Sequence, residues 1–126
     1  MKRLAPVLLA LAGCAHDGNW AQAPTVFNGP MAHDAALAMR VVWPPESTTL
    51  KATDDGSDLF WGTLLDQLRQ SGYAIAQTGL ALRYLVDRVD DSHYRVSILL
   101  DGQALHRLYH ADSGQLAPAS AWTRQQ

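Results

Sequence analysis

The chain has little of what would attach or crosslink it by ordinary means. It contains one cysteine in 126 residues, Cys14, so no disulfide can form within the chain. A membrane-spanning helix needs about 20 consecutive apolar residues, and the apolar run from Leu4 to Leu11 is far shorter and contains Pro6. The stability of the fold must therefore come from its core, and any membrane anchor must be something other than a spanning helix.

An excess of basic residues is also missing. The chain has 10 Lys and Arg against 12 Asp and Glu, and removal of residues 1–13 would leave 113 residues with a net charge of −4. Proteins that bind nucleic acid attract its phosphates with clustered Lys and Arg. The composition therefore argues against direct nucleic-acid binding, and the length predicts one modest domain.

No catalytic or metal-binding motif stands out in the sequence. Of the five histidines, only His106 and His110 have a metal-binding spacing, and on a strand they would lie roughly 13 Å apart. The acidic pairs Asp54-Asp55 and Asp90-Asp91 lie in turn sequences, where Asp forms local hydrogen bonds. There is no nucleophile motif and no Gly-rich phosphate loop. We therefore predict neither an enzyme nor a metal site.

The start of the chain has the layout of an export signal. Met1-Lys2-Arg3 is positively charged and precedes the apolar run. Leu11-Ala12-Gly13-Cys14 then resembles the lipobox of bacterial lipoproteins. The resemblance implies cleavage between Gly13 and Cys14, a diacylglycerol on the Cys14 sulfur and acylation of the new amino terminus. Each buried methylene contributes about 0.8 kcal/mol, and two or more chains give stable anchoring.

Two alternatives to lipidation remain: an ordinary export signal with an unrelated cysteine, and a cytoplasmic protein with an accidental apolar start. Ala15 follows the cysteine, in place of the Asp that retains many such lipoproteins in the inner membrane. We therefore expect attachment to the outer membrane, with the domain facing the periplasm and no cofactor besides the lipid on Cys14.

Residues 14–29 lack apolar periodicity and are rich in Asp, Asn, Gly and Pro, which predicts a lipidated extended tether. At about 3.3 Å per residue, Ala15 to Gly29 would extend roughly 50 Å at most. Trp20, Val26 and Phe27 are scattered through it. These side chains either rest on the protein's own surface or dock into a partner.

Two helices are predicted after the tether. The first has Asn28 as a cap and Pro30 in its first turn, and Pro44-Pro45 must end it. Its expected buried stripe consists of Ala35, Leu37, Ala38, Val41 and Val42. A strand over residues 37–43 is the alternative. The second helix follows the turn at Asp54 to Ser57 and ends near Gly72. Its large apolar residues recur at helical spacing: Phe60, Trp61, Leu64, Leu65 and Leu68.

The strands are predicted mainly after the second helix. Short strands are expected at Ser47 to Ala52 and Tyr73 to Gln77. Three segments then alternate with period 2: Leu82 to Asp87, Tyr94 to Asp101 and Ala104 to His110. Asp101-Gly102 is a strong hairpin signal. The pattern predicts an antiparallel meander with one face covered by the helices, followed by an irregular tail in which Trp122 packs. Open meander edges would permit self-association into a ring, although natural edges are often protected.

Five stretches, taken in order, resemble TrbH-type conjugal transfer lipoproteins. They are the lipobox, the helix ending in Trp43-Pro44-Pro45, residues Leu64 to Ala74, the strand Leu82-Arg83-Tyr84 and the closing segment Pro118 to Arg124. The order of these segments is more specific than any one of them.

The resemblance implies a structural subunit of the outer-membrane core of a type IV secretion apparatus, whose partners are channel subunits. It also implies an α+β domain similar to the short N-terminal domain of secretins and TonB-dependent receptors, with two helices packed between small sheets. The expected organisation is a signal peptide at 1–13, a lipidated tether at 14–29 and a globular domain at 30–126. Two other classes stay open: a periplasmic binding module or inhibitor, and an enzyme.

Overall fold

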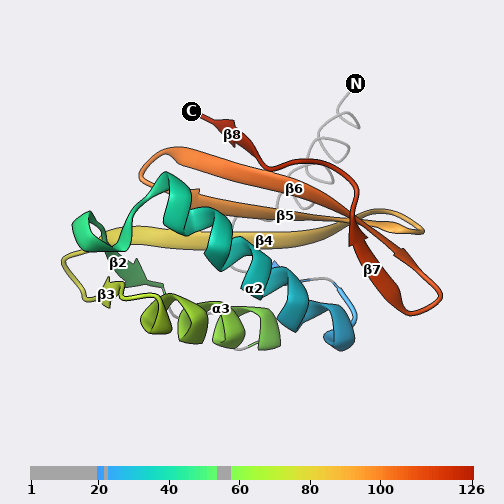
Figure 1. The fold of residues 1–126 in the computed structure, drawn as a ribbon, viewed down its shortest axis with the longest axis horizontal. Coiled ribbons are helices and arrows are strands. Elements are labelled where there is room, and N and C mark those ends of the chain that lie inside the picture. The colour runs from blue at the N-terminus through green and yellow to red at the C-terminus, as the bar shows by residue number, and fades with distance from the viewer. Residues whose placement is uncertain (1–19, 22, 54–57) are drawn as a thin grey trace, which may run out of the picture.

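The computed structural model describes residues 20, 21, 23–53 and 58–126. Figure 1 shows two helices and a set of strands, which confirms the predicted α+β class. In chain order the elements are β1 (Trp20–Ala21), α2 (Thr25–Val42), a 3-10 turn (Pro45–Ser47), β2 (Thr49–Ala52), α3 (Leu59–Gln70), β3 (Ala74–Ile75), β4 (Leu80–Asp90), β5 (His93–Leu100), β6 (Gln103–Asp112), β7 (Gln115–Pro118) and β8 (Thr123–Gln125).

The strands form one connected mixed sheet in the order β3-β2-β4-β5-β6-β7. The central strands β4, β5 and β6 are an antiparallel meander, as predicted. β2 runs parallel to both β3 and β4, while β1 pairs in parallel with β4 and β8 pairs antiparallel with β6. The small strands therefore do not form separate sheets on either side of the helices, which differs from the arrangement that the family resemblance implied.

Both helices pack on the same face of the meander. The alternation along β4 turns Leu82, Tyr84 and Val86 into the core, and all three are fully buried. The ring of Phe27 in α2 lies 6.1 Å from that of Tyr94 in β5, and the ring of Phe60 in α3 lies 5.1 Å from that of Tyr84. No helix of the described residues lies on the opposite face of the meander, which we call the helix-free face.

Helix α3 is placed by its first turn. Asp58 caps the helix, because its Oδ1 accepts a hydrogen bond from the backbone N–H of Trp61 at 2.8 Å. The other carboxylate oxygen of Asp58 accepts a hydrogen bond from the hydroxyl of Tyr84, whose ring stacks against Phe60 and Trp61. Gly72 ends the helix with a φ of 99°, as the sequence predicted. The prediction of α3 is confirmed.

Helix α2 begins earlier than predicted. It starts at Thr25, directly after Pro24, so the expected tether of residues 14–29 ends inside the helix. Pro30 lies within α2, although proline in a helix interior removes a hydrogen bond. Burial of Phe27 against the domain outweighs this cost, since tertiary packing supplies most of the stability of protein helices. The alternative of a strand over residues 37–43 is wrong.

The buried stripe of α2 also differs from the prediction. Leu37 and Val41 are 46% and 82% exposed, whereas Ala35 is buried as expected. The residues that face the core include small and flexible side chains: Met31, Ala32, Ala35, Ala36 and Met39. The helix is apolar on most sides, so hydrophobicity alone did not identify the side that faces the core.

The tail after Gly114 is ordered into two strands, which corrects the prediction of an irregular segment. Ser113 and Gly114 have φ values of 53° and 79°, the geometry of a tight hairpin turn, so β7 folds back on β6. β8 then pairs with Ala104–His106 of β6. Between the two strands, the N–H of Ala119 donates to the carbonyl of Leu108 at 2.8 Å. The outer edge of β6 is therefore covered along most of its length.

Gly79 lies where the chain passes close to β2. A Cβ atom added there would lie 2.5 Å from the carbonyl carbon of Leu50, so β2 would have to move away from β4. We expect Gly79→Ala to lower the free energy of unfolding by roughly 1–3 kcal/mol. Gly62 is the matched control, because it lies inside α3 with nothing within 4 Å of the added atom. Gly62→Ala should raise stability by about 0.5–1 kcal/mol. Urea unfolding of both variants measures the two changes in stability. Equal changes would contradict the close approach of Gly79 to β2.

Candidate interaction surfaces

The attachment residue Cys14 lies outside the described residues, and its lipidation stays a prediction. The first described segment is β1, where Trp20 pairs with Leu85 and Ala21 pairs with Val86 of β4. The domain therefore begins six residues after Cys14 in the chain. Six residues extend about 20 Å at most, which is much shorter than the 50 Å expected for the predicted tether.

The three residues considered for partner docking lie in different environments. Trp20 belongs to β1, and its backbone is paired with the domain's own sheet. Phe27 is 7% exposed and packs in the core, so it contacts its own domain, and its proposed role in docking is corrected. Val26 is 66% exposed on α2. Of the three, Val26 is a side chain that the structure places at the surface.

The C-terminal end of α2 borders a hollow of about 770 Å³. Leu37 and Val41 line one part of it, and Pro44 and Pro45 line another. The charged side chains of Arg40 and Glu46 lie beside these apolar groups. The hollow therefore offers an apolar surface with one residue of each charge.

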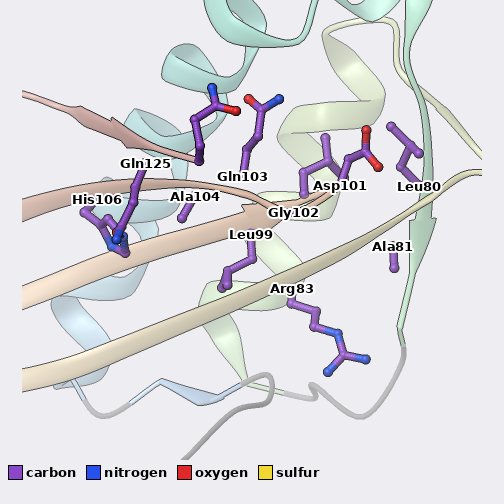
Figure 2. Close-up of a pocket in the computed structure, with 12 residues that line it drawn as sticks. Leu80, Ala81, Arg83, Leu99, Asp101, Gly102, Gln103, Ala104, His106 and Gln125 are labelled. Carbon is purple, nitrogen blue, oxygen red and sulfur yellow. The ribbon is translucent and has the colours of Figure 1, made fainter.

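A second hollow, of about 620 Å³, lies partly on the helix-free face (Figure 2). Ala81, Arg83 and Leu99 point to the same side of the sheet, and Arg83 pairs in register with Leu99. Leu99 is 40% exposed. No hydrogen bond or ion pair of Arg83 is found among residues 20, 21, 23–53 and 58–126, so its guanidinium can meet an outside group.

Two other polar residues that line this hollow, His106 and Gln125, bond to each other. Nδ1 of His106 lies 2.8 Å from Oγ of Ser97, and Nε2 of His106 lies 3.0 Å from Oε1 of Gln125. A Ser-His pair is part of a nucleophile arrangement, but the third group here is an amide and not a carboxylate. Ser97 is also 5% exposed. These bonds hold β5, β6 and β8 together.

The other described histidines also have hydrogen-bond or ring partners. His33 Nδ1 lies 3.0 Å from Oε1 of Gln67 and links α2 to α3. His93 faces His110 with a ring separation of 5.0 Å, and its Nδ1 lies 2.8 Å from Oδ1 of Asp90. Hydrogen bonds from the backbone N–H of Ser92 and from His93 lower the pKa of Asp90. In the part of the chain that the structure describes, no three His, Cys, Asp or Glu residues gather as metal ligands.

A polar cluster that sequence reasoning missed joins α2 to β6. Arg107 Nη1 donates to Oδ2 of Asp34 at 2.7 Å, and the hydroxyl of Tyr109 donates to the same oxygen. Arg107 Nε donates to the carbonyl of Ser120 at 2.9 Å, and its guanidinium lies 5.8 Å from the ring centre of Trp122. Trp122 thus packs in the tail as predicted. The contact between Asp34 and Arg107 spans 73 residues, and no local pattern in the sequence indicates it.

Two tyrosine hydroxyls of this layer have raised pKa values. Burial is the main cause in both, and it raises the pKa of Tyr73 from its ordinary 10 to about 12. The carboxylate of Asp34 adds to the effect of burial on the pKa of Tyr109. Because a buried phenolate is unfavourable, the folded state holds these protons more tightly than the unfolded chain.

Stability should therefore fall at alkaline pH. The pKa of Tyr73 is 10 in the unfolded chain and about 12 in the folded state, so between these pH values unfolding releases its proton. The stability that the protonated Tyr73 contributes is therefore complete below pH 10 and is lost as pH rises towards 12. Tyr73→Phe also removes the 2.5 Å hydrogen bond to the carbonyl of Trp43, worth about 1 kcal/mol. We expect the difference in unfolding free energy between wild type and Tyr73→Phe to shrink above pH 10. Urea unfolding at pH 8, 10 and 11 tests this, and a constant difference would contradict it.

Together, the helices and the mixed sheet define a small α+β domain. A family model described as "Conjugal transfer protein TrbH" matches residues 15–126, which is nearly the whole chain. The chain therefore belongs to the TrbH family of conjugal transfer proteins, as the sequence resemblance indicated. No curated protein and no solved structure matches it significantly. The likeness to the short N-terminal domain of secretins and TonB-dependent receptors stays a prediction.

Neither helix in the described ranges, which omit residues 1–19, 22 and 54–57, is long and apolar enough to cross a membrane.

Proposed function

We propose that this protein is an outer-membrane lipoprotein and a structural subunit of the channel core complex of a conjugal type IV secretion apparatus. Membership of the TrbH family supports a role in conjugal transfer. The Leu11-Ala12-Gly13-Cys14 motif supports lipid attachment, and Ala15 supports transfer to the outer membrane. The domain then faces the periplasm, and its partners are the channel subunits.

The observation that carries this proposal is the pairing of β1 with β4. Because Trp20 and Ala21 are paired with the sheet, the folded domain begins only six positions after Cys14. A lipidated Cys14 would hold the domain within about 20 Å of the bilayer. A subunit held so close to the membrane is suited to packing around the membrane end of a channel.

The contacts with neighbouring subunits are expected on the side-chain faces of the domain. Both edges of the meander are paired, β4 with β1 and β2, and β6 with β7 and β8. Strand addition to these two edges therefore requires displacement of the domain's own strands. The helix-free face, where Arg83 and Leu99 meet the hollow, offers a contact that leaves the strands in place.

Cys14→Ser tests the anchor. The variant should carry no lipid, leave the membrane fraction and lose support of conjugal transfer, because a thioether to diacylglycerol cannot form on serine. Palmitate labelling, membrane fractionation and transfer frequency from a strain lacking the native gene measure these effects. A Cys14→Ser protein that stayed acylated and membrane-bound would overturn the proposal.

Ala15→Asp provides a matched variant, because it leaves Cys14 intact and changes only the residue that determines sorting. It should remain palmitate-labelled but move from the outer to the inner membrane, and transfer should fall. Density-gradient separation of the two membranes measures the shift. Full transfer with the protein in the inner membrane would contradict an outer-membrane role.

A periplasmic binding module is the second candidate, and the hollow on the helix-free face favours it. Binding pockets usually combine an apolar lining with several convergent polar groups. Here His106 is engaged by Ser97 and Gln125. Arg83 points to one side of the sheet, whereas Asp101 and Gln103 point to the other, so these polar groups do not converge. This supports the structural role over the binding of a small molecule.

A further inference from the structure

The two helices of the domain differ in their outer surfaces. α3 presents polar side chains to solvent, including the ion-paired Asp66 and Arg69. α2 contains only two charged residues in 18, Asp34 and Arg40. A helix that is apolar on nearly all sides is normally covered on all sides. α2 packs on the sheet and on α3, but its outer side remains uncovered in the described structure.

The uncovered side of α2 carries an apolar stripe, which we define as Val26, Pro30, Leu37 and Val41. The exposed His33 lies beside this stripe and bonds to Gln67 of α3. The residues of the stripe are separated by 4, 7 and 4 positions, which places them on one side of a helix. Val26, Leu37 and Val41 are exposed large apolar side chains, and Val41 at 82% is the most exposed of those described.

Within α2, the charges beside this stripe are not balanced, although Glu46 of the following 3-10 turn lines the same hollow as Leu37 and Val41. Asp34 is the only acidic residue of α2, and its carboxylate is engaged by Arg107 and Tyr109. Arg40 is exposed in the last turn, next to Val41. The stripe therefore combines apolar side chains with a cation and has no available carboxylate of its own helix.

We propose that the apolar stripe of α2 lies on the surface of the membrane that holds the Cys14 lipid. This proposal rests on the proposed function, because it requires that lipid. α2 begins five residues after Trp20, and Trp20 follows Cys14 by six. With the anchor within about 20 Å of β1, the stripe is presented to the bilayer at a high effective concentration.

The chemistry of a lipid surface matches the stripe. Apolar side chains of an interfacial helix enter the boundary between headgroups and acyl chains, while Arg contacts headgroup phosphates. From Val26 to Val41 the stripe is about 22 Å long, at 1.5 Å per residue. A helix lying flat in this way would fix the orientation of the domain and turn its helix-free face away from the bilayer, towards the channel.

The test uses the lipidated full chain in vesicles of phosphatidylethanolamine and phosphatidylglycerol. Cys14 is the only native cysteine and carries the lipid, so one introduced cysteine is the only thiol available for labelling. An environment-sensitive fluorophore is placed at Val41→Cys on the stripe. The control is Leu99→Cys on the helix-free face, where the side chain is 40% exposed. Lipids with a nitroxide near the headgroup quench a fluorophore that reaches the interface.

We expect quenching at Val41→Cys to exceed that at Leu99→Cys by roughly threefold or more, as interfacial insertion requires. Equal quenching, or stronger quenching at residue 99, would overturn the proposal. Shielding of the Val41→Cys fluorophore from water in detergent, without vesicles, would also overturn the proposal if it increased with protein concentration. A second copy of the chain would then cover the stripe. Intact mass, measured first, separates the two proposals. An unlipidated Cys14 refutes the proposed function, whereas a lipidated chain with an unquenched stripe refutes only the inference about α2.

A second variant tests the same contact without a label. Val41→Asp should leave the fold intact, because Val41 is highly exposed, but it should place a carboxylate at the phosphate level and lower transfer frequency. Val89→Asp is the control, on an exposed side chain of β4. Circular dichroism verifies folding, and palmitate labelling verifies the anchor. Equal transfer by both variants would contradict a membrane contact of α2.

Discussion

The fold depends on how one edge of β4 is divided between two parallel strands. β2 pairs with Leu80–Leu82, and β1 pairs with Leu85 and Val86. At the join, Thr53 donates a hydrogen bond to the carbonyl of Leu82 at 3.2 Å. In the chain, β1 precedes α2, and β2 precedes α3. The positions of both helices over the meander therefore depend on hydrogen bonds along a single edge.

Tyrosine hydroxyls then hold the helical layer against the sheet. Tyr84 of β4 donates to Asp58 at the start of α3, and Tyr109 of β6 donates to Asp34 in α2. Tyr73, just after α3, donates to the carbonyl of Trp43 just after α2. Hydrogen bonds to charged groups contribute about 1.5–3 kcal/mol each, and they are directional. Apolar packing brings the layers together, and these bonds determine how the helices are placed on the sheet.

The parts of the fold that could be predicted have strong local patterns. The meander follows from period-2 alternation and from Asp101-Gly102, whose φ values of 54° and 75° are those of a hairpin turn. Helix α3 follows from large apolar residues at helical spacing between a capping Asp58 and Gly72. In these segments, local propensity and tertiary packing favour the same structure.

Other features depend on contacts that local sequence does not indicate. Pro30 suggested a helix start, but packing of Phe27 extends α2 to Thr25. The outer side of α2 could not be identified, since apolar residues occur nearly all around it. β7 and β8 are short and form only because β6 is beside them. Of the candidate surface, Val26 was named from the sequence, whereas the positions of Leu37, Val41 and Arg83 required the fold.

The two edges of the meander become covered at different times as the chain emerges from its N-terminal end. β1 and β2 precede β4, so the edge of β4 finds its partners already present. β7 and β8 follow β6, so the edge of β6 must wait for residues 115–125. During that interval its unpaired N–H and C=O groups are open to pairing with another chain. The last strands thus limit how long the chain is prone to aggregate before it folds.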